Sequence, residues 1–97
     1  MISFGNIVGF QWDEGNARKN DKHGVSRAEA EQVFLNAPLL VVADTAHSHE
    51  EQRFHALGVT DERRKLHITF TFRGPYLRVI SARDMHRKER SVYEEAD

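Results

Sequence analysis

Alternating hydrophobic and polar positions predict strands in the C-terminal half of the chain. Residues 66–72 alternate cleanly, as a strand with one buried face does. Gly74 and Pro75 indicate a turn, and residues 77–83 form the next expected strand. An apolar run at 39–43 and a less regular segment at 52–59 predict two earlier strands. Strict alternation over 77–83 places two sets of side chains on opposite faces: Val79, Ser81 and Arg83 against Arg78, Ile80 and Ala82.

Helix signals lie on both sides of these strands. Residues 13–22 are expected to be a helix that Asp13 caps and that ends at Gly24. Ser26 and Glu29 form a capping box for a second helix, which Pro38 stops, and residues 86–94 predict a third. The expected fold class is α+β, with two N-terminal helices, a four-stranded mostly antiparallel sheet and a C-terminal helix, all helices on one face. A short β-prone segment at 10–12 is a candidate for an additional leading strand.

Composition limits the chain to a few classes of protein. With 97 residues, one domain spanning 1–97 is expected. The chain has no cysteine, which removes disulfides, thiol chemistry and cysteine-ligated metal sites. No apolar run approaches the roughly 20 residues of a membrane span, and no signal peptide is evident. We therefore expect a cytoplasmic protein that has no membrane partner.

Charge is distributed unevenly although the formal net charge is only −1. Between residues 52 and 93 there are ten basic and four acidic residues. Such an excess suits a polyanionic partner such as RNA. A solvated surface with ordinary ion pairs accounts for the same pattern, so charge alone leaves both interpretations open.

Two kinds of chemistry are available to such a chain. A metal site could use the segment that holds Asp44, His47, His49, Glu50 and His55, although no specific ligand spacing stands out there. The second uses basic side chains of the strands and the last helix. A guanidinium matches phosphate oxygens, and fixed cations can stabilise the charge that develops during metal-free RNA cleavage. The arginines concerned are Arg53, Arg73, Arg78, Arg83, Arg87 and Arg90.

Several short motifs together resemble the BrnT toxin family. The N-terminal part contains Trp12-Asp13-Glu14 and Lys22-His23-Gly24-Val25-Ser26. The middle contains Glu51-Gln52-Arg53-Phe54, and the C-terminal part contains Arg78-Val79-Ile80-Ser81-Ala82-Arg83 followed by Glu89-Arg90. The resemblance covers about residues 10–95, nearly the whole chain. The motifs are quite specific in combination, whereas each alone would be weak.

The resemblance implies a RelE-like fold and a ribonuclease toxin of a type II toxin–antitoxin system. Such a toxin inhibits translation by cutting RNA, either free RNA or mRNA on the ribosome, and no cofactor is expected. The implied partner is a BrnA-like ribbon–helix–helix antitoxin, through which the complex would bind operator DNA indirectly.

Site residues follow from the resemblance position by position. The implied catalytic residues are Lys22, His23, Glu51, Arg53 and Arg83, with His23 as acid or base, Glu51 orienting a phosphate-binding Arg53, and Arg83 stabilising the transition state. Arg73, Arg78 and Arg87 are the expected RNA contacts. Tyr93 could reach this cleft or serve in packing.

The sequence also departs from the family pattern. Arg27 stands where the family often has an aromatic residue, Asn16 lies where a basic residue is common, and the isoelectric point is near 6.6. A non-catalytic protein-binding module that keeps the fold and the antitoxin surface is therefore the main alternative. A metal-dependent hydrolase that uses the loop of His47 and His49 is another.

Overall fold

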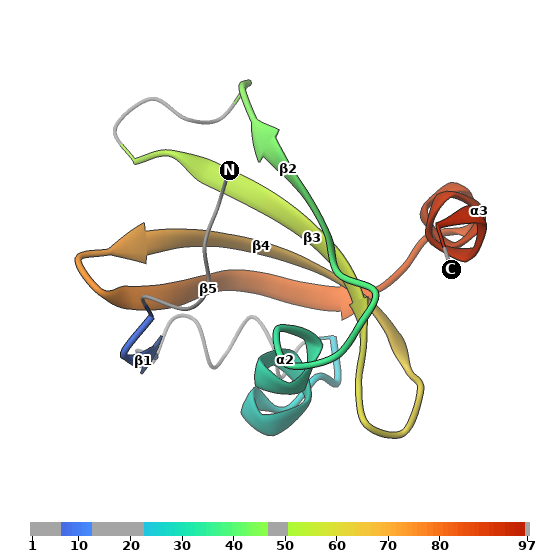
Figure 1. Cartoon of the computed structure of the whole chain (residues 1–97), viewed down its shortest axis with the longest axis horizontal. Coiled ribbons are helices and arrows are strands. Elements are labelled where there is room, and N and C mark those ends of the chain that lie inside the picture. The colour runs from blue at the N-terminus through green and yellow to red at the C-terminus, as the bar shows by residue number, and fades with distance from the viewer. Residues whose placement is uncertain (1–6, 13–22, 47–50, 97) are drawn as a thin grey trace.

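A computed structural model describes residues 7–12, 23–46 and 51–96. The sheet has the strand order β1-β5-β4-β3-β2 (Figure 1). Only the pairing of β1 with β5 is parallel, and the other three pairings are antiparallel. The elements are β1 (Gly9–Gln11), α2 (Arg27–Val33), β2 (Leu40–Asp44), β3 (Arg53–Val59), β4 (Lys65–Arg73), β5 (Tyr76–Asp84) and α3 (Arg87–Glu95).

The expected fold class is wrong in its count of strands and helices. The sheet is mixed and five-stranded, because residues 9–11 pair with the start of β5 instead of merely leading into a four-stranded sheet. The described residues hold one helix before β2, the helix α2, where two were expected. The segment expected to form the first helix, 13–22, lies outside the described residues. No helix in the described part of the chain is long and apolar enough to cross a membrane.

The start of α2 follows directly from local sequence. The Ser26 hydroxyl accepts a hydrogen bond from the Glu29 backbone N–H at 3.1 Å, and the Glu29 carboxylate accepts one from the Ser26 N–H at 3.0 Å. This reciprocal pairing confirms the expected capping box. Gly24 just before it has φ +68°, the left-handed conformation that glycine adopts without strain.

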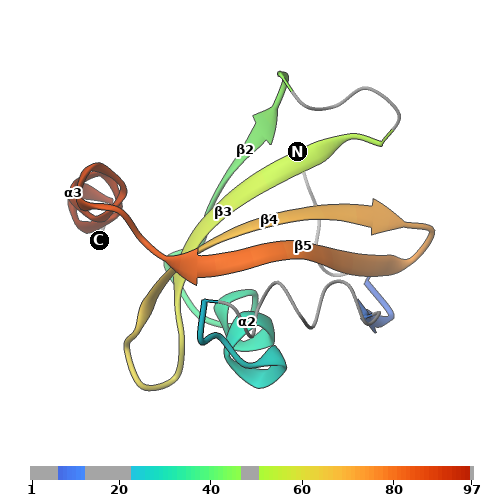
Figure 2. The ribbon, with the colours of Figure 1, turned by 180° about the vertical axis from the view of Figure 1, so that it is seen from behind.

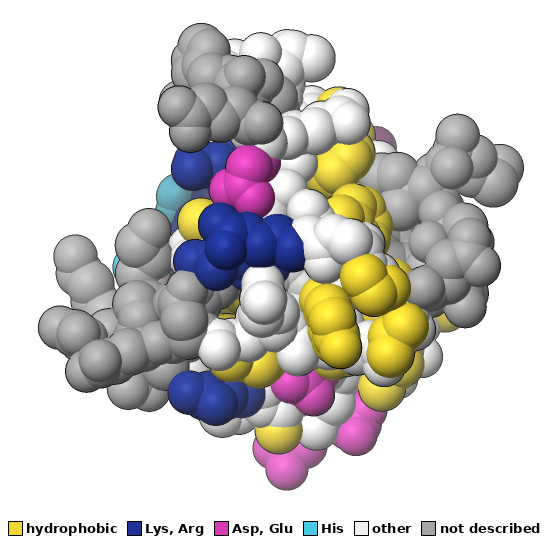
Figure 3. Space-filling model, turned by 90° about the vertical axis from the view of Figure 1, so that its left-hand side faces the viewer, with side chains coloured by type: hydrophobic (Ala, Val, Ile, Leu, Met, Phe, Trp, Pro, Cys, Tyr) yellow, Lys and Arg dark blue, Asp and Glu magenta, His cyan; other side chains and the backbone are white. Residues whose placement is uncertain are grey.

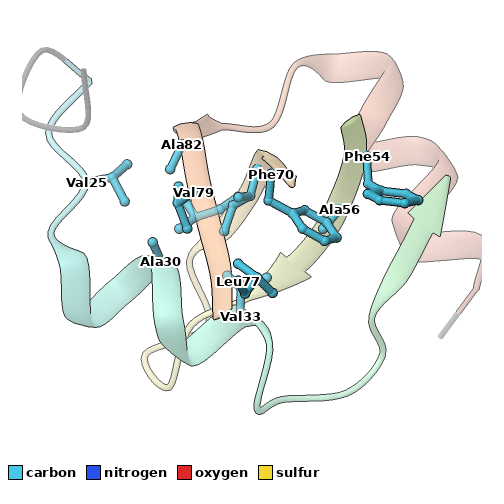
Figure 4. Close-up of a cluster of buried hydrophobic side chains, with 11 residues drawn as sticks. Val25, Ala30, Val33, Phe54, Ala56, Phe70, Leu77, Val79 and Ala82 are labelled. Carbon is cyan, nitrogen blue, oxygen red and sulfur yellow. The ribbon is translucent and has the colours of Figure 1, made fainter. Parts of the chain in front are cut away.

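One face of the sheet packs against α2 and forms the main core. Figure 4 shows Val25 and two residues of α2, Ala30 and Val33, among side chains of the neighbouring strands. Leu66, Ile68 and Phe70 of β4 are all fully buried on this face, as the alternation predicted. The other buried strand residues of this cluster are Phe54, Ala56, Leu77, Val79 and Ala82.

Helix α3 lies on the opposite side of the sheet. Both ribbon views place it beyond the end of β5 and away from α2 (Figures 1 and 2). Its Tyr93 is buried with Val59 and Met85, next to Leu57. Because Leu57 and Val59 alternate with Gly58, which faces α2, the two helices cover opposite faces and not one face as expected. The Tyr93 hydroxyl donates to the Pro38 carbonyl at 2.7 Å, so Tyr93 is a packing residue.

An arginine joins α2 to the far end of the strands. Arg64 donates to both carboxylate oxygens of Asp84, at 2.7 and 3.1 Å. It also donates to the Gly24 carbonyl at 2.9 Å and to Glu29 at 3.0 Å. The hydrogen bond from Arg64 lowers the pKa of Asp84. The pKa of Glu29 is lowered mainly by the hydrogen bond from the Ser26 backbone N–H, and Arg64 adds to this effect. One guanidinium thus connects the turn before α2, the helix itself and the end of β5.

Candidate active site

The face of the sheet turned away from α2 is polar, and its residues are set by register. His55 pairs with Thr69, His67 with Arg83, and Thr71 with Arg78, so their side chains project to the same side. We call this surface the polar face. It consists of Asp44, Arg53, His55, His67, Thr69, Thr71, Arg73, Arg78, Ser81 and Arg83, and Leu40, Val42 and Leu57 form its apolar part.

A β-bulge in β5 corrects the expected arrangement of that strand. Thr69 pairs with Ser81 while the next residue of β4, Phe70, pairs with Val79, which leaves Ile80 as an extra residue. Val79 therefore points into the core and not to the side of Arg83. Because of the extra residue, Arg78 and Arg83 share the polar face, although strict alternation places them on opposite faces.

Arginines meet a carboxylate at the end of the polar face nearest the β4–β5 turn. Arg73 donates to the two Glu51 oxygens from Nε at 3.0 Å and from Nη2 at 3.4 Å. The hydrogen bond from Arg73 holds the Glu51 pKa below its usual value, and the charges of Arg78 and Arg53 add to this effect. Figure 3 views this end of the molecule and shows Lys and Arg side chains gathered about an acidic group.

A second charged pair lies at the other end of the polar face. Arg83 donates to Glu89 of α3 through two parallel hydrogen bonds of 2.8 and 3.0 Å. The hydrogen bond from Arg83 and that from the His86 backbone N–H lower the Glu89 pKa to about 2. Arg83 also donates to the Asp84 carbonyl at 3.0 Å. A fork of this kind holds a guanidinium in a fixed orientation.

Two histidines occupy the middle of the polar face. His55 Nε2 lies 2.9 Å from Asp44 Oδ2, and His55 Nδ1 lies 3.0 Å from the Thr69 hydroxyl. Since an ionised carboxylate can only accept, Nε2 carries the proton toward Asp44. The His67 ring lies against His55 with 4.9 Å between centroids, and its Nε2 is 4.0 Å from Glu89. Burial and the charge of Arg83 lower the His67 pKa to about 4.

The structure brings together part of the predicted site. Glu51, Arg53, Arg73 and Arg78 gather at one end of the polar face, and Arg83 lies on the same face at the other end. The β4 partners of Arg78 and Arg83, Thr71 and His67, are four positions apart, a distance of about 13 Å along the strand. The carboxylate of Glu51 makes its ion pair with Arg73 of a neighbouring strand, whereas Arg53 acts on it through charge.

Other predicted site residues lie away from the polar face or outside the residues that the structure describes. His23 occupies an exposed turn beside Val25, which packs on the α2 side of the sheet, across from Arg83. Arg87 is the exposed first residue of α3. Lys22 lies outside the described residues, as do His47, His49 and Glu50 of the metal hypothesis. Within the described ranges, no group of three or more potential metal ligands is found.

Sequence reasoning missed His67 and Glu89 as neighbours of Arg83. His67 was visible as a polar position of an alternating strand, and Glu89 stands six residues after Arg83. Neither position indicates that a helix folds back against the polar face. The spatial cluster depends on where α3 packs.

The chain matches the sequence model of a protein family described as ribonuclease toxin, BrnT, of type II toxin–antitoxin systems. The match spans residues 12–89, which is most of the chain and includes both arginine groups of the polar face. A search of curated proteins finds no match.

Proposed function

Since the chain belongs to the BrnT family of ribonuclease toxins of type II toxin–antitoxin systems, we propose that it is an endoribonuclease that cleaves RNA on its polar face without a metal ion. The observation that carries the proposal is the placement of two arginine groups on one face of the sheet. Guanidinium groups bind phosphate through paired N–H donors and supply positive charge that is independent of pH near neutrality. The fixed cations can provide the stabilisation of the transition state that a metal ion supplies in other nucleases.

Each arginine group has a separate role in this proposal. Arg53, Arg73 and Arg78 hold the RNA backbone, and Glu51 orients Arg73 through their ion pair. In the cleavage step a base takes the proton of the 2′-hydroxyl, the 2′-oxygen bonds to phosphorus, and the bond from phosphorus to the 5′-oxygen breaks as an acid protonates that oxygen. Arg83, fixed by its fork to Glu89, stabilises the charge that develops on the phosphate in this step. The spacing between the two groups allows one RNA strand to lie along the face and contact both.

The biological consequence we propose is the arrest of translation in the cytoplasm through the loss of mRNA. A BrnA-like ribbon–helix–helix antitoxin would neutralise the protein, and operator DNA would be bound through that antitoxin. The family supports an antitoxin partner and an RNA substrate in general terms. The finer identification rests on the resemblance of the sequence motifs.

Cleavage of total RNA in EDTA tests the proposal. The wild-type protein should cut RNA, and Arg83→Ala should be slower by about 100-fold or more, the usual cost of removing one transition-state donor. Arg83→Lys keeps the charge but loses the fork to Glu89, so its cleavage rate should lie between those of the wild type and Arg83→Ala. Arg63→Ala is the control, because Arg63 is exposed in the turn between β3 and β4, away from the polar face.

Three results would contradict parts of the proposal. Cleavage that EDTA abolishes would exclude the metal-free mechanism. An Arg83→Ala protein that melts and cleaves like the wild type would remove Arg83 from the site. If the wild-type protein cuts neither free RNA nor mRNA on ribosomes, the non-catalytic binding module becomes the better description.

A further inference from the structure

A hollow of about 340 Å³ opens between α3 and the end of the polar face that carries β2 and β3. We call it the α3 groove. Its walls are largely aliphatic, and at one side it reaches the charged residues of the polar face. Its lining residues are Leu40, Val42, Leu57 and Val92, together with His55, His67 and Glu89.

Two valines on different walls of the groove are unusually exposed. Val42 of β2 is 63% exposed and Val92 of α3 is 56% exposed. A single exposed valine is ordinary, but here the two border the same hollow as Leu40 and Leu57. A contiguous apolar surface of this kind in a soluble domain marks a contact site for another molecule.

The chemistry of the walls favours a protein segment as the occupant. The aliphatic walls of the groove neither pair with phosphate nor offer flat rings on which bases stack, so these walls suit a protein segment better than RNA. Strand β2 is an edge strand of the sheet, and no described strand pairs with its outer edge, where an added chain could bind through backbone groups.

Charge at the beginning of α3 favours an acidic neighbour for those apolar contacts. Glu89 is paired with Arg83 through two hydrogen bonds. Arg87 and Lys88 are exposed, and Lys88 lies one turn before Val92 on the same side of the helix. This end of the groove therefore carries positive charge next to an apolar wall.

We propose that the α3 groove is the docking surface for a segment of the antitoxin that carries apolar side chains beside an acidic one. This inference rests on the proposed function, because a type II toxin is held by a protein antitoxin. A segment in the groove would lie over Glu89 and His67, directly beside Arg83. Docking would thus cover the place where RNA is proposed to react, which explains neutralisation by the same contact.

Binding of the purified antitoxin encoded with this chain tests the inference. Val42→Lys and Val92→Lys change exposed positions. Each should raise the Kd for the antitoxin, measured by calorimetry, by about tenfold or more, the usual effect of losing one anchor residue of an interface. Leu35→Lys is the matched control, because Leu35 is 78% exposed and lies outside the groove. Lys88→Glu leaves the core untouched and should weaken binding more at low than at high salt.

Parallel measurements separate this inference from the proposed nuclease function. RNA cleavage by the wild-type protein without antitoxin reports the nuclease activity, whereas Kd reports docking. Unchanged affinity in both valine variants, with thermal melts like the wild type, would overturn the inference. So would sedimentation showing a wild-type dimer that the valine variants dissociate, because a second copy of the chain would then occupy the groove.

Discussion

His67 is an ionisable side chain held neutral among charged neighbours. Its side chain is only 12% exposed, and burial is the largest cause of its low pKa. The nearby guanidinium of Arg83 also disfavours protonation of His67. The carboxylate of Glu89 favours protonation, but this effect is smaller than the other two together. Its buried Nδ1 has no hydrogen-bond partner among the described residues. His67 therefore supports the Arg83–Glu89 pair by packing, without competing for the carboxylate as a cation.

This environment predicts a pH-dependent stability. An unfolded histidine takes up a proton near pH 6.5, whereas folded His67 does so only near pH 4. Between these values the unfolded state binds more protons, so the free energy of unfolding falls as the pH falls. We expect the free energy of unfolding, measured by urea denaturation, to fall between pH 7 and pH 4.5. The fall should be larger in the wild type than in His67→Gln, by about 2 kcal/mol. His23→Gln, at an exposed turn, should lose as much stability as the wild type.

At the scale of elements, α2 packs onto β3 through a glycine. A Cβ added at Gly58 would lie 2.5 Å from Val33 Cγ1 and 3.4 Å from Leu39 Cδ1. Val33 is fully buried, so it has little room to move away. Glycine at this position lets the helix approach the sheet closely enough to close the core.

Gly58→Ala is therefore expected to push α2 away from the sheet. We expect a loss of about 1–3 kcal/mol in the free energy of unfolding, the range for overpacking a filled core, measured by urea denaturation. Gly9→Ala is a suitable comparison, because a Cβ there meets nothing within 4 Å. Equal stability of the two variants would show that the contact between α2 and β3 is loose.

At the scale of the whole molecule, the net charge is close to zero, but arginine side chains are concentrated on one face of the sheet. The chain has a net charge of −1, yet Arg53, Arg73 and Arg78 act together on one carboxylate. Attraction of RNA must then come from this local concentration. The strength of binding should depend on salt as it does for a site that neutralises a few phosphates.

This reasoning predicts a modest salt slope for the affinity of single-stranded RNA. With three to four phosphates neutralised, the slope of log K against log salt should be about −2 to −3. Arg73→Ala should make it shallower by about 0.7, the contribution of one phosphate contact, in fluorescence anisotropy titrations. Arg63→Ala should leave the slope unchanged, and a similar change in both variants would contradict a localised RNA site.

The sequence by itself determined the features that depend on near neighbours in the chain. The alternation over 66–72 defined the buried face of β4, and the Ser26–Glu29 pair defined the start of α2, because strand pleat and helix capping act within a few residues. The shared motifs indicated the family and, through it, an RNA substrate, whereas the arginines of the later strands fitted either RNA binding or ordinary ion pairs. The sequence did not predict the direction of a side chain where that direction depends on the pairing between strands.

Only the tertiary structure decided which of these residues act together. The bulge at Ile80 turns Arg78 and Arg83 to one face, and it arises from the register of β5 against β4. The parallel pairing of β1 and the packing of α3 opposite α2 join segments far apart in sequence. Such contacts depend on the burial of surface between distant segments, which no local pattern encodes. They place Glu89 beside Arg83 and His67 and so create both the proposed site and the α3 groove.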